Sequence, residues 1–164
     1  MSKVLIVMGS QSDFDVVKKA ADMLSKFSID YTIRVISAHR TPSAAAEVAS
    51  SAQKDGYSAI IAAAGKAAHL GGVLAAYTVL PVIGIPIKSS FMDGMDSLLS
   101  MVQMPKGIPV ATVAVDGAEN AAILAAQMIA LSDEGLRAKL EEYKESMARD
   151  VEKQDKAVNE LISK

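Results

Sequence analysis

Two histidines are the only imidazoles in the chain, and each lies beside a residue that suits the binding of an anion. His39 is followed directly by Arg40, and His69 lies in a run of small residues that also contains Lys66. An imidazole gives or takes a proton near neutral pH, whereas a guanidinium binds phosphate or carboxylate in a two-pronged contact. These residue types predict proton chemistry on a negatively charged small molecule.

A second polar group follows the first apolar run of the chain. In Gly9-Ser10-Gln11-Ser12-Asp13, the glycine permits a sharp turn, and free backbone amides with two hydroxyls would face the start of a helix. Ser10 and Ser12 therefore suit a phosphate, while Asp13 would repel phosphate and suit ribose hydroxyls. The alternative that Ser12 or Asp13 only caps the helix stays open at this point.

The residues around His39 form a third polar group, again at the end of an apolar run. Ser37, His39 and Arg40 lie here in order. Thr41 and Pro42 follow, and a proline is typical of the first turn of a helix. In the functional interpretation, Ser37 and Arg40 bind an anion beside the imidazole. The alternative makes Thr41 a helix cap, Arg40 a surface charge and His39 a solvated loop residue.

The residues 64–72 form a glycine-flanked loop around His69. Small side chains here would let a flat ligand approach the backbone, and the candidate lining residues are Ala64, Gly65, Lys66, Ala67 and Leu70. The loop is neither a Walker motif, because no Ser or Thr follows Lys66, nor a dinucleotide fingerprint. The histidines have neither the short spacing nor the adjacent carboxylate typical of a metal site. We expect no metal and no organic cofactor.

Composition excludes several classes of function. The 164 residues contain no cysteine, which excludes thiol chemistry and fits a reducing compartment. The formal net charge is -2, without a basic block that could neutralise a run of phosphates, so we expect no nucleic-acid partner. The longest apolar stretch, Val73 to Ile87, is interrupted by Pro81 and Gly84 and is too short to span a bilayer. We expect no membrane contact, no export signal and a cytoplasmic location.

Strands and helices must hold these polar groups together. Five apolar runs of strand length recur with helical segments between several of them: Val4 to Met8, Tyr31 to Ile36, Ala59 to Ala64, Val82 to Ile87 and Val110 to Val115. This alternation predicts an α/β fold, a three-layer sandwich with a central parallel sheet of the flavodoxin-like or Rossmann-like kind. In such a sheet ligands bind beyond the carboxyl ends of the strands, where all three polar groups lie.

The sequence indicates a single domain over residues 1–164, because no repeat, linker or low-complexity tract divides it. Helices are predicted to begin near five positions: Asp13, Thr41, His69, Asp96 and Glu119. From Ser132 onward apolar residues recur three or four apart, which predicts an amphipathic helix over 132–164. Such a helix would be longer than a small domain is wide, so we expect part of its apolar face at a subunit interface.

Six segments taken together resemble the PurE family of purine biosynthesis. They run in order from the first strand past Leu131: Gly-Ser-Gln-Ser-Asp, Ser-Ala-His-Arg-Thr-Pro, Ala-Ala-His-Leu, Leu-Pro-Val-Ile-Gly-Ile-Pro, Asp-Ser-Leu-Leu-Ser-Met-Val-Gln-Met-Pro-Lys-Gly-Ile-Pro-Val-Ala-Thr and Asn-Ala-Ala-Ile-Leu-Ala-Ala-Gln. Each segment alone is a weak signal. Their order and spacing over most of the chain make the resemblance specific.

The resemblance implies an activity and an assembly. The activity is conversion of N5-carboxyaminoimidazole ribonucleotide to 4-carboxy-5-aminoimidazole ribonucleotide in de novo purine biosynthesis, without ATP, metal or organic cofactor. The assembly is a homo-octamer with active sites near subunit contacts. We therefore expect a small ribonucleotide substrate and a homo-oligomer.

The resemblance also implies roles for the candidate residues. His39 would carry the proton between the two carboxylation sites, and His69 would help to shape the pocket. Residues 65–70 would surround the base and the carboxylate. Phosphate and ribose would be bound by a set of polar side chains carried over by motif: Ser10, Ser12, Asp13, Ser37 and Arg40.

Three residues depart from the usual mutase pattern, which reads Gly-Gly-Ala-Ala-His-Leu-Pro-Gly-Met. Lys66 replaces the second glycine, Gly71 the proline and Val73 the methionine. A basic residue at the first of these places is similar to a related class that carboxylates aminoimidazole ribonucleotide directly with carbon dioxide, although that class lacks a counterpart of His69. Direct carboxylation is therefore the alternative activity. A non-enzymatic nucleotide-binding or regulatory domain is a remote alternative, because Gly65 and Lys66 stand where a receiver domain would carry a phosphorylatable aspartate.

Overall fold

The computed structural model describes residues 2–163, in which strands and helices alternate. The strands are β1 (Lys3–Met8), β2 (Asp30–Val35), β3 (Tyr57–Gly65), β4 (Val82–Ile87) and β5 (Ala111–Thr112). The α-helices are α1 (Phe14–Lys26), α2 (Pro42–Ser51), α3 (Leu70–Ala76), α4 (Met95–Val102), α5 (Ala118–Ile129) and α6 (Glu134–Ile162). Single turns of 3-10 helix, η1 (Gln11–Asp13) and η2 (Met92–Gly94), precede α1 and α4.

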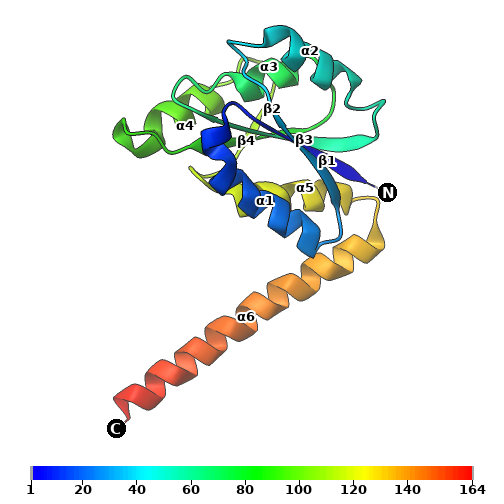
Figure 1. Cartoon of the computed structure of the whole chain (residues 1–164). Coiled ribbons are helices and arrows are strands. Elements are labelled where there is room, and N and C mark those ends of the chain that lie inside the picture. The colour runs from blue at the N-terminus through cyan, green and yellow to red at the C-terminus, as the bar shows by residue number, and fades with distance from the viewer. Residues whose placement is uncertain (1, 164) are drawn as a thin grey trace.

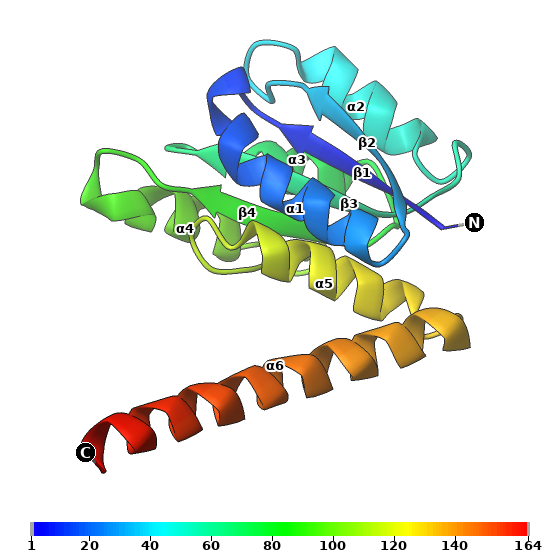
Figure 2. The ribbon, with the colours of Figure 1, turned by 60° about the horizontal axis from the view of Figure 1, so that its bottom comes forward.

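The strands form one parallel sheet in the order β2-β1-β3-β4-β5. Helices α1 and α5 cover one face, and α2, α3 and α4 cover the other (Figures 1 and 2). Along β1, Val4 and Ile6 pack into the core on the α1 and α5 side, whereas Leu5 and Val7 pack into the core on the other side. The predicted three-layer α/β fold is confirmed, and the near-continuous apolar runs of β1, β3 and β4 are explained by burial on both faces, whereas β2 at the sheet edge is mostly exposed.

The strand predicted over 110–115 is wrong in length, since β5 covers only Ala111 and Thr112. The cause lies in the neighbouring strand. The Pro86 carbonyl accepts a hydrogen bond from the backbone of Asp116, so it faces β5. In a strand the N–H and C=O of one residue point to the same side, and proline has no N–H. The hydrogen bond that would extend the β4–β5 pairing is therefore missing.

The helices begin next to their predicted starts, and the long C-terminal helix is confirmed. α6 begins after Asp133, whose carboxylate accepts a hydrogen bond from the Leu136 amide at 2.9 Å and caps the helix. Of its 29 residues only Leu136 and Leu140 are buried. Figure 1 shows α6 running away from the sheet, and every residue of α6 after Ser146 is exposed. No helix within residues 2–163 has the length and apolar character needed to cross a membrane.

Candidate active site

A pocket of about 580 Å³ lies at the carboxyl ends of β1, β2, β3 and β4. The connection after β1 runs to β2 on one side and the connection after the adjacent β3 runs to β4 on the other, so a crevice opens between the carboxyl ends of β1 and β3. The volume is in the range of small-molecule sites. Every candidate residue from the sequence lines this pocket: Ser10, Ser12, Asp13, Ser37, His39, Arg40, Ala64, Gly65, Lys66, Ala67, His69 and Leu70.

Hydrogen bonds between neighbouring residues shape the loop after β1. The Ser10 hydroxyl caps η1 by accepting from the Ser12 amide at 3.3 Å. The Ser12 hydroxyl lies 2.9 Å from the Ser10 hydroxyl and 3.1 Å from the Asp13 carboxylate, so its one proton is available to either. Asp13 makes no capping bond to α1. Asp13 holds the N-cap position of α1 without a side-chain capping bond, and Ser10 caps η1, so neither Ser12 nor Asp13 caps α1 through its side chain.

Asp13 is the one buried carboxylate among residues 2–163, with 8% of its surface exposed. Burial raises its pKa above the usual aspartate value, because a charge is less stable away from water, and the nearby charge of Asp116 raises it further. Hydrogen bonds from the Ser12 side chain and the Ser10 backbone oppose the shift. A buried carboxylate at the pocket wall is an acceptor that a ligand hydroxyl can satisfy.

Arg40 is held by contacts to two strand-end loops. Its backbone N–H and its Nε donate to the Ser37 hydroxyl at 3.2 and 3.4 Å, and its Nη2 donates to the Gly9 carbonyl at 3.3 Å. Thr41 holds the N-cap position of α2 but makes no side-chain capping bond; its hydroxyl accepts from the Ser37 amide and donates to the Ser37 carbonyl. Arg40 is exposed, and its guanidinium is oriented towards the loop after β1.

The two histidines meet although 30 positions separate them in the chain. His39 Nε2 lies 2.8 Å from His69 Nδ1, and the rings stand edge to face at 79° with centroids 5.0 Å apart. One of these nitrogens must donate and the other accept, so the two facing positions hold a single proton between them. The pair can therefore pass one proton and receive it back. Residues 2–163 hold no grouping of three His, Cys, Asp or Glu side chains suited to a metal ion.

Lys66 adopts a left-handed backbone conformation, with φ at 55°. Glycine takes this conformation without strain, whereas another residue loses about 1 kcal/mol or more. This explains why the usual pattern has glycine here. The turn is closed by a hydrogen bond from the Ala68 amide to the Lys66 carbonyl at 2.9 Å. It leads directly to His69 and α3, so the backbone of Lys66 shapes the wall that holds the imidazole.

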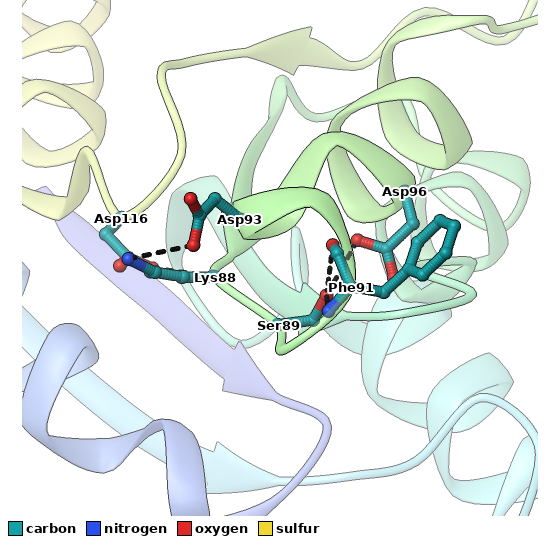
Figure 3. Close-up of polar contacts among 6 residues, drawn as sticks. All are labelled: Lys88, Ser89, Phe91, Asp93, Asp96 and Asp116. Carbon is teal, nitrogen blue, oxygen red and sulfur yellow. Dashed lines mark hydrogen bonds and ion pairs between the residues drawn. The ribbon is translucent and has the colours of Figure 1, made fainter.

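Five residues beyond the candidate binding residues also line the pocket: Gly9, Ala38, Ile87, Lys88 and Ser89. Lys88 and Ser89 follow β4 in the same way as the candidate residues follow β1, β2 and β3. The rule that ligands bind beyond the carboxyl ends of the strands therefore applies to these two as well. Figure 3 shows the loop that they begin, with Lys88 directed towards Asp93 and Ser89 towards Asp96.

These features define a class of protein: a three-layer α/β enzyme with a pocket at the carboxyl ends of its strands that is lined by cationic and hydroxyl side chains and by a pair of imidazoles. The chain belongs to the AIR carboxylase family, whose model matches residues 3–150.

Two relatives and one solved structure illustrate the similarity. N5-carboxyaminoimidazole ribonucleotide mutase of Pyrococcus abyssi is 56% identical over 149 residues, which cover 91% of this chain and 86% of the relative. The mutase of the same name from Thermotoga maritima is 52% identical over 151 residues, covering 92% and 88%. The crystal structure of Treponema denticola PurE superposes with a TM-score of 0.88 at 31% identity, covering 96% of this chain and 98% of that one.

Proposed function

We propose that this chain is an isomerase that converts N5-carboxyaminoimidazole ribonucleotide to 4-carboxy-5-aminoimidazole ribonucleotide in de novo purine biosynthesis. Membership of the AIR carboxylase family and about 50% identity to proteins named as this mutase support the activity. The observation that carries the chemistry is the 2.8 Å contact between His39 and His69 in a pocket beside Arg40. The reaction moves a carboxyl group within one molecule, so one proton given and one proton returned balance it.

Substrate binding follows from the polar groups on the four strand-end loops. The phosphate is bound by the guanidinium of Arg40 with the hydroxyls of Ser10, Ser12 and Ser37, since a fixed guanidinium suits a phosphate. Asp13 accepts ribose hydroxyls, which compensate its loss of water. The loop with Ala64, Gly65, Lys66, Ala67 and Leu70 then lies against the base and the carboxylate.

The mechanism uses His39 as the proton carrier. The N5–carboxyl bond breaks as the exocyclic nitrogen gains a proton from the imidazolium, which leaves carbon dioxide and the amine. Carbon 4 then attacks the retained carbon dioxide, and the imidazole removes the proton that carbon 4 carries. His69 holds the His39 ring through the shared hydrogen bond. Acid–base catalysis supplies about 10²- to 10⁴-fold, so retention of carbon dioxide against the ring must supply much of the remaining acceleration.

Direct carboxylation with free carbon dioxide is the alternative reaction, and the names of the relatives do not favour it. The two reactions differ in the origin of the new carboxyl carbon. We would supply unlabelled N5-carboxyaminoimidazole ribonucleotide in buffer with excess ¹³C-bicarbonate and carbonic anhydrase, and measure the label in the 4-carboxy product. A mutase yields mainly unlabelled product at short times. Product that carries the label of the pool from the first turnover would overturn the mutase assignment.

The assembly and location extend the same proposal. We propose a homo-octamer in which the apolar stripe of α6, formed by Met147, Val151, Val158 and Leu161, packs on another subunit. These side chains are 43 to 75% exposed in the single chain, which is uncommon for apolar residues at helical spacing. We place the enzyme in the cytoplasm, because a phosphorylated substrate does not cross membranes and must be made and used in one compartment.

A further inference from the structure

Two lysines follow adjacent strand ends at one side of the pocket. Gly65 of β3 pairs with Ile87 of β4, so Lys66 and Lys88 occupy the next position on neighbouring strands, and both line the pocket. Arg40 lies on the other side of β1, after β2. A ligand whose phosphate contacts Arg40 therefore extends its other end towards the lysines.

The backbone of Lys88 is fixed, whereas its side chain is free to move. The Lys88 amide donates to the Asp116 carboxylate at 2.9 Å. The buried Ser97 hydroxyl lies 2.8 Å from the Ile87 carbonyl and 2.9 Å from the Gly94 carbonyl, and ties the end of β4 to the start of α4. The Lys88 side chain is 60% exposed. Because the Lys88 side chain is long and flexible while its backbone is fixed, its ammonium group can contact either Asp93 or a ligand in the pocket.

Asp93 is the partner of Lys88 in this structure. Lys88 Nζ lies 3.1 Å from Asp93 Oδ1, and the Asp93 side chain is 85% exposed (Figure 3). Met92, Asp93 and Gly94 all have positive φ, and these left-handed residues turn the chain back towards Lys88. Ion pairs this exposed contribute little to stability, because water and salt screen both charges. A carboxylate held by further contacts in the pocket can therefore replace Asp93.

We propose that Lys88 binds the carboxylate of the ribonucleotide and that Asp93 is a displaceable counter-ion that occupies Lys88 until the ligand arrives. This inference rests on the proposed function and adds a specificity residue to it. Because a neutral base offers nothing to the ammonium, Lys88 distinguishes carboxylated from uncarboxylated ribonucleotides. When Asp93 is released, Ser89 keeps the base of the loop in place through its contact with Asp96 at 2.9 Å.

The test compares two ligands that differ only in the carboxyl group. Calorimetric titration of Lys88→Met should show about tenfold weaker binding of 4-carboxy-5-aminoimidazole ribonucleotide and less than twofold change for aminoimidazole ribonucleotide. Lys54→Met is the matched control, since Lys54 is an exposed lysine that precedes β3 at the amino ends of the strands, away from the pocket. Equal weakening of both ligands would assign Lys88 to the phosphate and overturn the proposal, as would no weakening of either.

A second variant tests the counter-ion. Asp93→Asn removes the competing charge, and asparagine tolerates the positive φ at this position. The 4-carboxy ligand should bind about threefold tighter, and this gain should vanish in the Lys88→Met background. A gain that persists there, or no gain at all, would overturn the displacement. If the unmodified protein binds neither ribonucleotide, the proposed function fails; if it binds both and Lys88→Met does not discriminate, only this inference fails.

Discussion

At the scale of single residues, the contact between His39 and His69 determines what proton chemistry is available. The facing nitrogens, His39 Nε2 and His69 Nδ1, share one proton. The other nitrogen of each ring, Nδ1 of His39 and Nε2 of His69, is therefore the one that can exchange a proton with a ligand. Both rings are exposed, but a ring oriented by a second ring is a better proton carrier than a freely rotating one, since less orientational entropy is lost during the reaction. The pair therefore acts as one unit in the proposed mechanism.

His39→Asn should retain binding and lose turnover. Asparagine is polar and smaller than histidine but cannot carry a proton, so kcat should fall at least 100-fold while aminoimidazole ribonucleotide binds within about threefold of its normal affinity. Steady-state kinetics and calorimetry measure the two effects. His69→Asn is the comparison variant, and we expect a smaller loss of kcat because His39 remains. Normal turnover in His39→Asn would exclude the proton-carrier role.

Arg40→Ala should act mainly on binding. Removal of a guanidinium that is held by Ser37 and Gly9 deprives the phosphate of its charged partner, so KM should rise about 10- to 100-fold with a much smaller change in kcat. Ser37→Ala should give a milder rise, because it only loosens the guanidinium. A variant that lowers kcat and leaves KM unchanged would place Arg40 in the chemical step instead.

Asp13→Asn should increase stability at neutral pH and reduce substrate binding. Burial raises the pKa of Asp13 in the folded state, so the folded chain binds this proton more tightly than the unfolded chain, and stability from this group decreases as pH rises above the ordinary aspartate range. Asparagine removes that cost. Thermal unfolding should give a higher Tm for the variant at pH 7, with a difference that shrinks as the pH is lowered towards 4. A pH-independent difference would contradict this explanation.

At the scale of elements, α4 approaches β4 closely because β4 carries a glycine. A Cβ on Gly84 would overlap the Sδ of Met101 and would lie 2.8 Å from its Cγ and 3.0 Å from Val110 Cγ1. Met101 is 1% exposed, so its side chain is enclosed by the core. The position of α4, and with it the loop after β4, depends on this close contact.

Gly84→Ala should therefore destabilise the fold by about 1–3 kcal/mol, which is the usual cost of forcing extra volume into a packed core. Gly71→Ala in α3 is the control. Its Cβ would meet its nearest neighbour, Val110 Cγ1, at 3.4 Å, and alanine favours a helix, so we expect no comparable loss. Urea unfolding of both variants measures the difference. Similar stabilities would show that α4 can shift away from the sheet without penalty.

At the scale of the whole molecule, packing within the single chain accounts for only the first turns of α6. Its first turns pack on the body through Leu136 and Leu140, and Lys139 donates to the Ser28 hydroxyl at 3.1 Å. Tyr143 still packs edge to face on Phe27. Beyond it the apolar residues Met147, Val151, Val158 and Leu161 continue at helical spacing and are exposed, on the part of α6 that runs away from the sheet in Figure 1. A helix about 44 Å long that lacks a partner over most of its length is typical of a subunit contact.

The double variant Val151→Glu and Val158→Glu should reduce the assembly while leaving the fold of each chain intact. Both valines are more than half exposed in the single chain, at 63% and 53%, so the charges disturb only a contact with another subunit. Light scattering after size exclusion should give a lower mass, and circular dichroism should be unchanged. The variant Lys153→Glu and Lys156→Glu is the matched control. An unchanged mass for the valine variant would exclude this face of α6 from the interface.

The sequence alone determined the elements and most of the pocket. Apolar periodicity and turn residues act over a few positions, so strands and helix starts were predictable, and so were the residues at the ends of β1, β2 and β3. The tertiary structure decided the strand order, the contact of His39 with His69, the short β5 opposite Pro86, and the pairing of Lys88 with Asp93. These features depend on which strands lie side by side. Strand order is set by packing between segments far apart in the chain, and it cannot be predicted from local sequence patterns.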